Sequence, residues 1–276
     1  MKEPQPLDFE KPIMELQRRL QEIRDHSDEH ALDFDAEVEA MEAKIETTRR
    51  EIYGNLSAWQ RVQIARHTQR PFALDYVERC FTNWNELHGD RLFGDDKAMP
   101  CGIAMLGEQR CVVITNQKGR NTKENVMRNF GCAHPEGYRK ALRLMQLGEK
   151  FNLPVISLVA DHVMILENAY YSVISPEACS AILWKDRRHA AEAAEALKLT
   201  GQDLMKLNVV DEVVAEPDGG AHRDHEKAAQ ILREALRSNL KRLLKTPINQ
   251  LLKKRYEKFR RLGNFAEPPR GNGATG

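Results

Sequence analysis

Residues 154–159, PVISLV, are the part of this sequence that decides the fold. The run is apolar on both faces, which is typical of a buried strand in a parallel sheet covered by helices. Before it, residues 136–151 have the apolar spacing of a helix, and we expect Tyr138, Leu142 and Met145 to point inward. A helix that leads into a buried strand indicates an α/β fold.

Further strand and helix signals lie on both sides of this run. Short β-branched or apolar runs predict strands at 101–106 and 110–115, joined as a hairpin, and at 163–166 and 171–174. Residues 199–214 are expected to form a helix and then a strand. Because helices alternate with buried strands, the predicted fold class is α/β with a mostly parallel sheet.

The N-terminal region has a different pattern. Two amphipathic stretches separated by a polar break at 26–30 predict a helical hairpin over residues 1–56. Residues 57–262 are then the main domain, with helices again from residue 221. Residues 263–276 contain several proline and glycine residues and are expected to be a flexible tail.

Two further helix starts can be read from the main domain. Ser57 and Gln60 have the spacing of a capping box, in which each side chain satisfies the backbone of the other residue. Another helix is expected to follow Pro71 and to continue to Trp84. Residues 125–130 should form a short helix of their own.

Composition limits the class of protein. Charged residues make up 30% of the 276 residues and apolar ones 41%, which is the profile of a soluble globular protein. The net charge of +1 gives no general attraction to nucleic acid or anionic membrane. There is no apolar run of about eighteen residues, and the first residues resemble neither a signal nor a transit peptide. The five scattered cysteines fit reduced thiols, so we expect a cytoplasmic protein without a membrane partner.

The link between two of the predicted strands is too short. Only Ala160, Asp161 and His162 separate the strand at 154–159 from the strand at 163–166. Two parallel strands need a crossover of about ten to twelve residues, and this tripeptide is also a poor hairpin turn. Either the whole segment is one long strand or a crossover is absent.

Two longer blocks carry a resemblance to a known family. They are residues 117–151, QKGRNTKENVMRNFGCAHPEGYRKALRLMQLGEKF, and residues 171–186, YSVISPEACSAILWKD. They resemble the α subunit of the bacterial and plastid multisubunit acetyl-CoA carboxylase, and the resemblance runs from residue 7 to residue 223. It implies a crotonase-like ββα core. It also implies transfer of a carboxyl group from carboxybiotin on a carrier protein to acetyl-CoA, which gives malonyl-CoA for fatty-acid synthesis.

The resemblance implies partners as well. They are a zinc-bearing carboxyltransferase β subunit, a biotin carboxyl carrier protein and biotin carboxylase, with α and β forming an α2β2 assembly. No cofactor would be bound covalently to this chain. Carboxybiotin and acetyl-CoA would be its substrates, and nothing like a zinc ribbon occurs in the sequence.

The family comparison also bears on the short link. In the family a turn, a helix, another strand and a glycine-rich loop follow the Pro-Val-Ile strand, whereas here Val159 is followed directly by Ala160. The resemblance implies that this loop stabilises developing oxyanions with backbone N–H groups, so the catalytic residues of this chain remain unassigned. The segment is either deleted or omitted from the sequence as written. Omission is favoured because the free-energy cost of losing a core strand and helix would exceed a typical free energy of unfolding of about 5–15 kcal/mol.

Candidate substrate-binding residues lie in both family blocks. Lys118, Gly119 and Arg120 follow a predicted strand, with Lys123 close behind, and such a cationic loop could hold CoA phosphates or the carboxylate of carboxybiotin. The alternative is a solvated loop that contacts a partner subunit. Ser175 could donate a hydrogen bond in a site, or could serve only as the N-cap of a helix.

Other motifs indicate chemistry less strongly. Glu177 could be a general base, although an acid in a first helical turn usually complements the helix dipole. His222 and His225 form an H-x-x-H pattern without a third ligand, so we expect surface histidines and no metal site. Gly219 and Gly220 are expected in a surface turn.

Two rival functions remain open at this point. One is a non-catalytic homologue that acts as a scaffold for the β subunit. The other is a different crotonase-type enzyme, such as an enoyl-CoA hydratase, which would leave the N-terminal hairpin unexplained. The basic stretch at 241–261 could bind RNA or an acidic partner, but an amphipathic docking helix is favoured.

Overall fold

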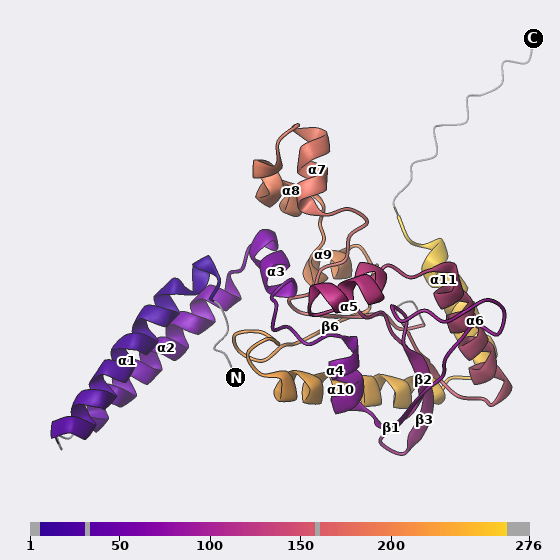
Figure 1. Ribbon diagram of the computed structural model, residues 1–276, viewed down its shortest axis with the longest axis horizontal. Helices are drawn as coiled ribbons and strands as arrows, with labels where there is room; N and C mark the ends of the chain where they lie inside the picture. Colours follow the sequence, from indigo (N-terminus) through magenta and orange to yellow (C-terminus); the bar gives the residue numbers. More distant parts are fainter. Residues whose placement is uncertain (1–5, 31–33, 158–160, 264–276) are drawn as a thin grey trace, which may run out of the picture.

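The computed structural model describes residues 6–30, 34–157 and 161–263 (Figure 1). A short 3-10 turn, η1 (Asp8–Glu10), leads into two long helices, α1 (Lys11–His30) and α2 (Asp35–Gly54). The two helices pack side by side and extend away from the rest of the molecule. Their contact is an apolar cluster of buried residues, Ile13, Leu16, Leu20 and Ile45. The two helices expected in this region are therefore present.

The capping box predicted from the sequence is also present. Helix α3 (Ala58–Ala65) begins after Ser57, whose Oγ accepts a hydrogen bond from the Gln60 backbone N–H at 3.2 Å. In return the Ser57 backbone N–H donates to Gln60 Oε1 at 2.8 Å. Together the two side chains accept hydrogen bonds from backbone N–H groups that have no partner within the first turn of the helix.

The helix expected to continue to Trp84 is shorter than predicted. Helix α4 (Ala73–Cys80) ends at Cys80, and strand β1 (Thr82–Glu86) begins two residues later. The Trp84 ring lies over Gly102 of the neighbouring strand, so close that a Cβ at Gly102 would be 2.8 Å from it. This cross-strand packing outweighs the helical spacing of the apolar residues.

The main sheet has the strand order β1-β2-β3-β4. Strands β2 (Cys101–Leu106) and β3 (Gln109–Ile114) form the expected hairpin. Strand β1 is antiparallel to β2, whereas β4 (Val155–Ile156) is parallel to β3. The sheet is therefore mixed, and the expectation of a mostly parallel sheet is wrong.

A separate two-stranded sheet contains β5 (Met164–Leu166) and β6 (Glu212–Val214), which run parallel. Residues 171–174, expected to be a strand, do not form one. The Ser172 hydroxyl donates to the Ile174 carbonyl at 2.8 Å and holds the backbone in a local turn. In the part of the chain that the structure describes, no strand pairs β4 with β5.

The remaining helices surround these sheets. They are α5 (Thr122–Met127), η2 (Asn129–Gly131), α6 (Pro135–Lys150), α7 (Pro176–Leu183), η3 (Arg187–His189), α8 (Ala190–Ala196), α9 (Gly201–Lys206), α10 (His225–Leu244) and α11 (Ile248–Arg260). Helices α7 and α8 form a lobe that projects from the body (Figure 1). None of the described helices combines the length and apolar character needed to cross a membrane.

Helix α10 supports both sheets. Its apolar side chains Leu232, Leu236 and Leu240 pack against the core of the main sheet. On the same helix, the Asn239 side-chain amide donates to Glu212 Oε2 of the second sheet at 2.6 Å. One helix therefore holds two sheets that share no strand pairing among the described residues.

The inward face of α6 differs from the prediction. Tyr138, Leu142 and Met145 are exposed, at 63%, 55% and 38% of their surface. The buried face carries Leu144, small residues and Lys140. The fully buried Lys140 Nζ donates to Asp95 Oδ1 at 2.6 Å and to the Asp96 carbonyl at 2.8 Å. The prediction was wrong because it placed the largest apolar side chains inside, whereas a paired lysine occupies the core.

The strand expected at residues 154–159 is more exposed than predicted where the structure describes it. Of the four residues of this run that the structure describes, 154–157, only Val155 and Ile156 form strand β4, and both are half-buried, whereas the expected strand is covered on both faces. Val159 and Ala160, where the sequence suggests a missing segment, lie outside the described residues. The described chain resumes at Asp161, which pairs with Arg255 of α11 at 2.7 Å.

A buried ion pair joins the α3–α4 connection to the segment after β6. Arg70 donates to both carboxylate oxygens of Glu216, one of them at 2.9 Å, and only 8% and 1% of the two side chains are exposed. Glu216 also accepts from the backbone N–H groups of Asn168 at 3.1 Å and Ala221 at 2.9 Å. Burial alone would raise the pKa of Glu216, but Arg70 and these donors hold that pKa below its ordinary value.

Replacing Arg70 with methionine should therefore be costly, because Glu216 would stay buried without its counter-charge. We expect Arg70→Met to lower the free energy of unfolding by about 3–5 kcal/mol, measured by urea denaturation. The matched control is Arg18→Met, which removes an exposed pair with Glu22 and should cost less than about 1 kcal/mol. Equal losses for the two variants would contradict a special role for the buried pair.

Candidate functional site

The first candidate site is the cationic loop that leaves the carboxyl end of β3. Lys118 and Lys123 lie in this loop and the first turn of α5, and both are exposed. Neither ammonium group has a carboxylate partner among the residues that the structure describes. Two unpaired cations at a strand end form a suitable place for a phosphate or carboxylate.

The other two predicted residues of this loop have structural roles. Arg120 pairs with Asp75 of α4, and its guanidinium carbon lies 4.6 Å from the centre of the Phe72 ring. Gly119 is buried where α5 approaches so closely that a Cβ would be 2.3 Å from the Asn125 backbone nitrogen. Gly119 and Arg120 therefore fix the loop, and the two lysines remain free to bind a ligand.

A strained turn lies against this loop. Asn129 and Phe130 have positive φ angles of 44° and 55°, and Gly131 follows with 83°. The turn is next to Lys118, since a Cβ at Gly131 would be 3.5 Å from the Lys118 Cβ. Left-handed backbone at non-glycine residues costs about 1–3 kcal/mol and is concentrated at functional sites. The sequence analysis placed Phe130 in a helix at 125–130 and not in a site, but α5 ends at Met127 and the left-handed backbone of Phe130 forms this turn.

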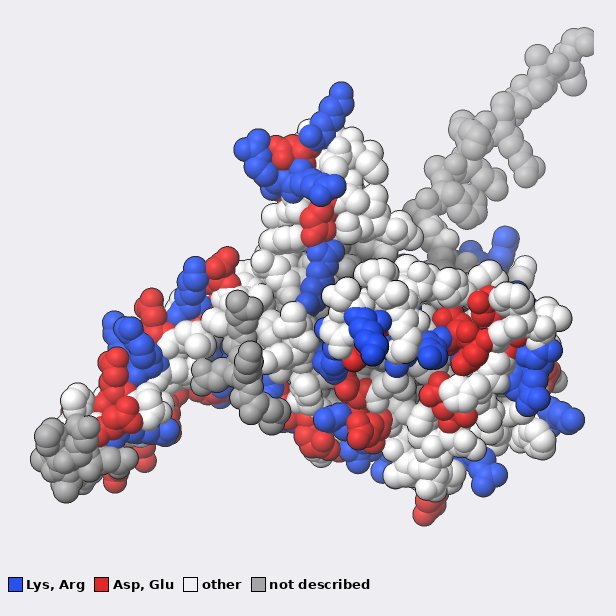
Figure 2. Space-filling view, in the orientation of Figure 1, with Lys and Arg blue, Asp and Glu red and all other residues white. Residues whose placement is uncertain are grey.

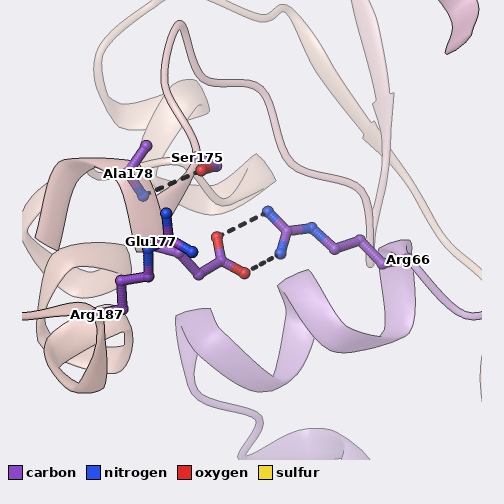
Figure 3. Close-up of a pocket in the computed structure, with 5 residues that line it drawn as sticks. All are labelled: Arg66, Ser175, Glu177, Ala178 and Arg187. Carbon is purple, nitrogen blue, oxygen red and sulfur yellow. Dashed lines mark hydrogen bonds and ion pairs between the residues drawn. The ribbon is translucent and has the colours of Figure 1, made fainter. Parts of the chain in front are cut away.

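The second candidate site is a cavity of about 430 Å³ at the base of the projecting lobe. It is lined by Arg66, Ser175, Glu177, Ala178 and Arg187 (Figure 3). Ser175 Oγ accepts from the Ala178 backbone N–H at 3.2 Å, so Ser175 is the N-cap of α7. Lys and Arg side chains gather at the outer end of the lobe (Figure 2), which favours the approach of an anion.

Glu177 is held in its ionised form. Arg66 donates to both of its carboxylate oxygens, as the dashed lines in Figure 3 mark. Arg66 also contacts Tyr170, with its Nε 3.1 Å from the phenol oxygen. The ion pair with Arg66 lowers the pKa of Glu177 below its ordinary value, which makes this carboxylate a weak base at neutral pH. Arg187 also lines the cavity, on the side of Glu177 that is away from Arg66 (Figure 3), and the described chain gives it no carboxylate partner.

The structure brings only some of the predicted residues together. Lys118, Gly119, Arg120 and Lys123 form one loop, as expected. Ser175 lies in the projecting lobe, and no hydrogen bond or ion pair in the described ranges joins it to that loop. Any ligand that contacts both would have to span the space between them.

The two histidines of the H-x-x-H pattern point to different partners. His222 is only 3% exposed and stacks on His67, with ring centres 4.2 Å apart, so its expected surface position is wrong. His225 Nε2 lies 2.6 Å from the Gln69 carbonyl oxygen. Within the described residues no three His, Cys, Asp or Glu side chains are grouped to hold a metal.

The glycine pair before His222 is buried as well, contrary to the expected surface turn. Gly219 and Gly220 have φ angles of 85° and 88°, which only glycine adopts readily. This turn brings the Ala221 N–H back onto the carboxylate of Glu216. The sequence pattern identified the turn but not the buried acid that it folds around.

His222 should make stability depend on pH. Burial, followed by the nearby His67, lowers the pKa of His222 to about 4, from 6.5 for a solvated histidine. Between these values the unfolded chain binds a proton at this position and the folded chain does not. Its contribution to stability is therefore complete above pH 6.5 and is lost as the pH falls towards 4.

We expect this contribution to decrease by about 2 kcal/mol between pH 7 and pH 5. The measurement is the free energy of unfolding at both pH values for the unchanged chain and for His222→Leu. The leucine variant should lack this decrease, whereas His189→Leu, at a partly exposed position between α7 and α8, should retain it. If the unchanged chain and His222→Leu had the same pH dependence, a buried neutral His222 would be ruled out.

Comparison with known proteins gives a consistent pattern. Residues 6–161 and 157–263 match, as two segments, the family described as acetyl co-enzyme A carboxylase carboxyltransferase-like. The chain is 43% identical to the acetyl-coenzyme A carboxylase carboxyl transferase subunit alpha of Thermus thermophilus, over 315 positions that cover 95% of this chain and 100% of the relative. The subunits of Geobacter metallireducens and Geobacillus kaustophilus are 44% and 42% identical, again over 95% of this chain and over 98% and 97% of the relatives.

Proposed function

This chain belongs to the family of acetyl-CoA carboxylase carboxyltransferase α subunits, and we propose that it contributes to the carboxyl transfer for which its relatives are named. In this reaction a carboxyl group moves from carboxybiotin, held on a carrier protein, to acetyl-CoA and gives malonyl-CoA. The similarity extends over nearly the whole chain and the whole relative, and this observation carries the proposal.

The cationic loop supports a role in binding the anionic substrates. Lys118 and Lys123 are exposed and unpaired in the described chain, while Gly119 and Arg120 hold the loop in place. Both acetyl-CoA and carboxybiotin carry negative charge, so either could place a phosphate or a carboxylate here. Phe130, on the adjoining strained turn, offers an exposed ring to the same ligand.

Ser175 could contribute from the second site. Its oxygen accepts the capping hydrogen bond from Ala178, and its hydroxyl is a hydrogen-bond partner of the Glu177 carboxylate, so a ligand in the cavity would compete with Glu177 for the hydroxyl proton. Arg187 and the Arg66–Glu177 pair would set the charge around that ligand. A substrate-binding role for Ser175 is thus compatible with its role as N-cap.

The proposed partners are those of the family. A zinc-bearing β subunit would complete the active site, and the biotin carboxyl carrier protein would deliver carboxybiotin made by biotin carboxylase in the cytoplasm. The exposed apolar face of α6, with Tyr138, Leu142 and Met145, is suited to contact another subunit within an α2β2 assembly.

Binding the substrates does not by itself accelerate the transfer. Acceleration needs hydrogen-bond donors directed at the oxygen on which negative charge develops. The resemblance assigns such donors to a glycine-rich loop. The lysines of the cationic loop therefore act as positioning groups, and their removal should weaken substrate binding.

The proposal can be tested with the complex of this chain and its cognate β subunit. We expect a stable complex by gel filtration with light scattering, and binding of acetyl-CoA and of carboxylated carrier protein in calorimetric titrations. The double variant Lys118→Ala, Lys123→Ala should lower the affinity for one of the two ligands by roughly tenfold, which is about 1.4 kcal/mol. The ligand whose affinity falls is the one that the loop binds.

The matched control is Lys253→Ala on the exposed face of α11, which should change neither affinity. Failure to associate with the β subunit would contradict the carboxyltransferase proposal. Unchanged affinity for both ligands in the double variant would contradict the role given to the cationic loop.

A further inference from the structure

A cavity of about 800 Å³ lies between the β2–β3 turn and the end of helix α10. Residues within 106–109 line it from the turn, and residues within 237–245 line it from the helix. Its volume is in the range of about 300–1,000 Å³ that is usual for small-molecule sites. The turn precedes β3 and the cationic loop follows it, so about 17 Å of strand separates the two places. This α10 cavity is therefore separate from the cationic loop.

Three cationic side chains follow one face of α10 along the cavity. Arg237, Lys241 and Lys245 are spaced four residues apart, which puts them on one side of the helix at steps of about 6 Å. All three are exposed, and among the residues that the structure describes none of them has a carboxylate or hydrogen-bond partner. Unpaired like charges on one helix face repel each other, so they favour an anion that carries more than one charge.

The helix dipole explains only part of this arrangement. Cations in the last turn complement the negative end of a helix, and this accounts for Lys241 and for Lys245 at the C-cap. Arg237 lies about two turns before the end of α10, where the effect of the dipole is small. A purely structural role of the three cations therefore leaves Arg237 and the cavity unexplained.

Other cations of the basic stretch at 241–261 have protein partners. Arg242 donates to Asn239 Oδ1 at 2.7 Å, and Lys258 pairs with Asp211, so both contribute to the side of the molecule on which the second sheet lies. Lys241 follows Asn239 by two residues, which is a rotation of about 200° around the helix. Lys241 therefore points away from that sheet and towards the cavity that it lines.

Arg237 is held flat against the β2–β3 turn. Gly107 in this turn has a φ angle of 62°, and a Cβ at this glycine would lie 3.2 Å from Arg237 Nε and 3.3 Å from both Cζ and Nη2. Because the three distances are nearly equal, one face of the guanidinium plane covers the glycine. The opposite face is available to stack on an aromatic ring of a ligand.

The cavity also offers apolar surface and a hydrogen-bond acceptor. Leu240 packs on the core of the main sheet, and Leu244, one turn further along α10, is 54% exposed. Glu108 lines the cavity from the turn, is exposed, and has no cationic partner in the described chain. A carboxylate near bound phosphates can accept hydrogen bonds from ribose hydroxyl groups, as an acid does in dinucleotide sites.

We propose that the α10 cavity binds a nucleoside diphosphate. Arg237 and Leu244 contact the base, Glu108 accepts hydrogen bonds from the ribose, and Lys241 and Lys245 hold the two phosphates. A plain inorganic anion would use the lysines but neither the flat guanidinium nor the acid. The same chemistry is present in a free nucleotide such as ADP and in the nucleotide part of coenzyme A. The proposal does not depend on the proposed carboxyl transfer, because it uses no residue of the cationic loop or the projecting lobe.

The first experiment titrates the full chain with ADP, pyrophosphate and coenzyme A in a calorimeter. We expect ADP to bind roughly tenfold more tightly than pyrophosphate, which lacks the base and the ribose. The double variant Lys241→Ala, Lys245→Ala should lower the affinity for ADP by roughly tenfold. The matched control is Lys253→Ala, Lys254→Ala, which removes two exposed lysines from α11 and should leave the affinity for ADP unchanged.

Arg237→Lys separates stacking from charge. The variant keeps the positive charge but loses the planar group, so we expect the affinity for ADP to fall about fivefold. The affinity for pyrophosphate should stay the same, since it has no ring to stack. An equal loss of affinity for both ligands would contradict the contact between Arg237 and the base.

Hydrogen exchange in the unmodified chain locates the ligand without any substitution. ADP should slow the exchange of amides in residues 106–109 and 237–245 and leave residues 116–123 unchanged. Protection at 116–123 alone would place the nucleotide in the cationic loop and overturn the proposal. Because this measurement needs no variant, a substitution that impairs folding does not remove the test.

The two sources of the nucleotide are distinguished by their affinities. Coenzyme A that binds more tightly than ADP, with a loss of affinity in Lys241→Ala, Lys245→Ala, would assign the cavity to coenzyme A. Tighter binding of ADP, with the same loss, would assign it to a free nucleotide, and either result supports the proposal. Equal affinity for ADP and pyrophosphate would make the cavity a general anion site. This result, or binding of RNA oligonucleotides without binding of ADP, would overturn the proposal.

Discussion

The buried pair of Arg70 and Glu216 is the interaction on which the arrangement of this molecule most depends. Glu216 follows the second sheet, and Arg70 precedes α4, which packs on α10 beneath the main sheet. Because the described strands of the two sheets do not pair with each other, the sheets are joined by this ion pair and by α10. A buried carboxylate is tolerable only with its full set of donors, which Arg70, Asn168 and Ala221 supply.

The same dependence on close contacts shapes the candidate site. Gly119 lets α5 approach the end of β3, and Arg120 is bound to α4, so the loop is held by groups that a ligand does not need to touch. The free charges of Lys118 and Lys123 then have a defined position. Because the loop is already ordered, binding of an anion would not carry the entropic cost of ordering it. In the proposed function the cationic loop is a binding element, and the chemistry requires donors from elsewhere.

Local patterns in the sequence predicted local structure well. The capping box at Ser57, the N-cap at Ser175 and the hairpin of β2 and β3 all depend on neighbouring residues and were confirmed. One error is local, since a turn at Ser172 replaces the strand expected at 171–174, and the others concern contacts between distant residues. Apolar spacing could not reveal that Lys140 is buried against Asp95, nor that His222 stacks on His67. The cationic loop was found through family resemblance, while its anchoring to α4 required the structure.

Native-state hydrogen exchange at increasing urea concentration tests most directly whether the two sheets, which share no strand pairing among the described residues, open separately. The account predicts that amides of β5 and β6 open at a lower free energy than amides of β2 and β3, because the two sheets share no strand pairing. A single opening free energy for all four strands would mean that the sheets unfold as one cooperative unit, and would contradict the account.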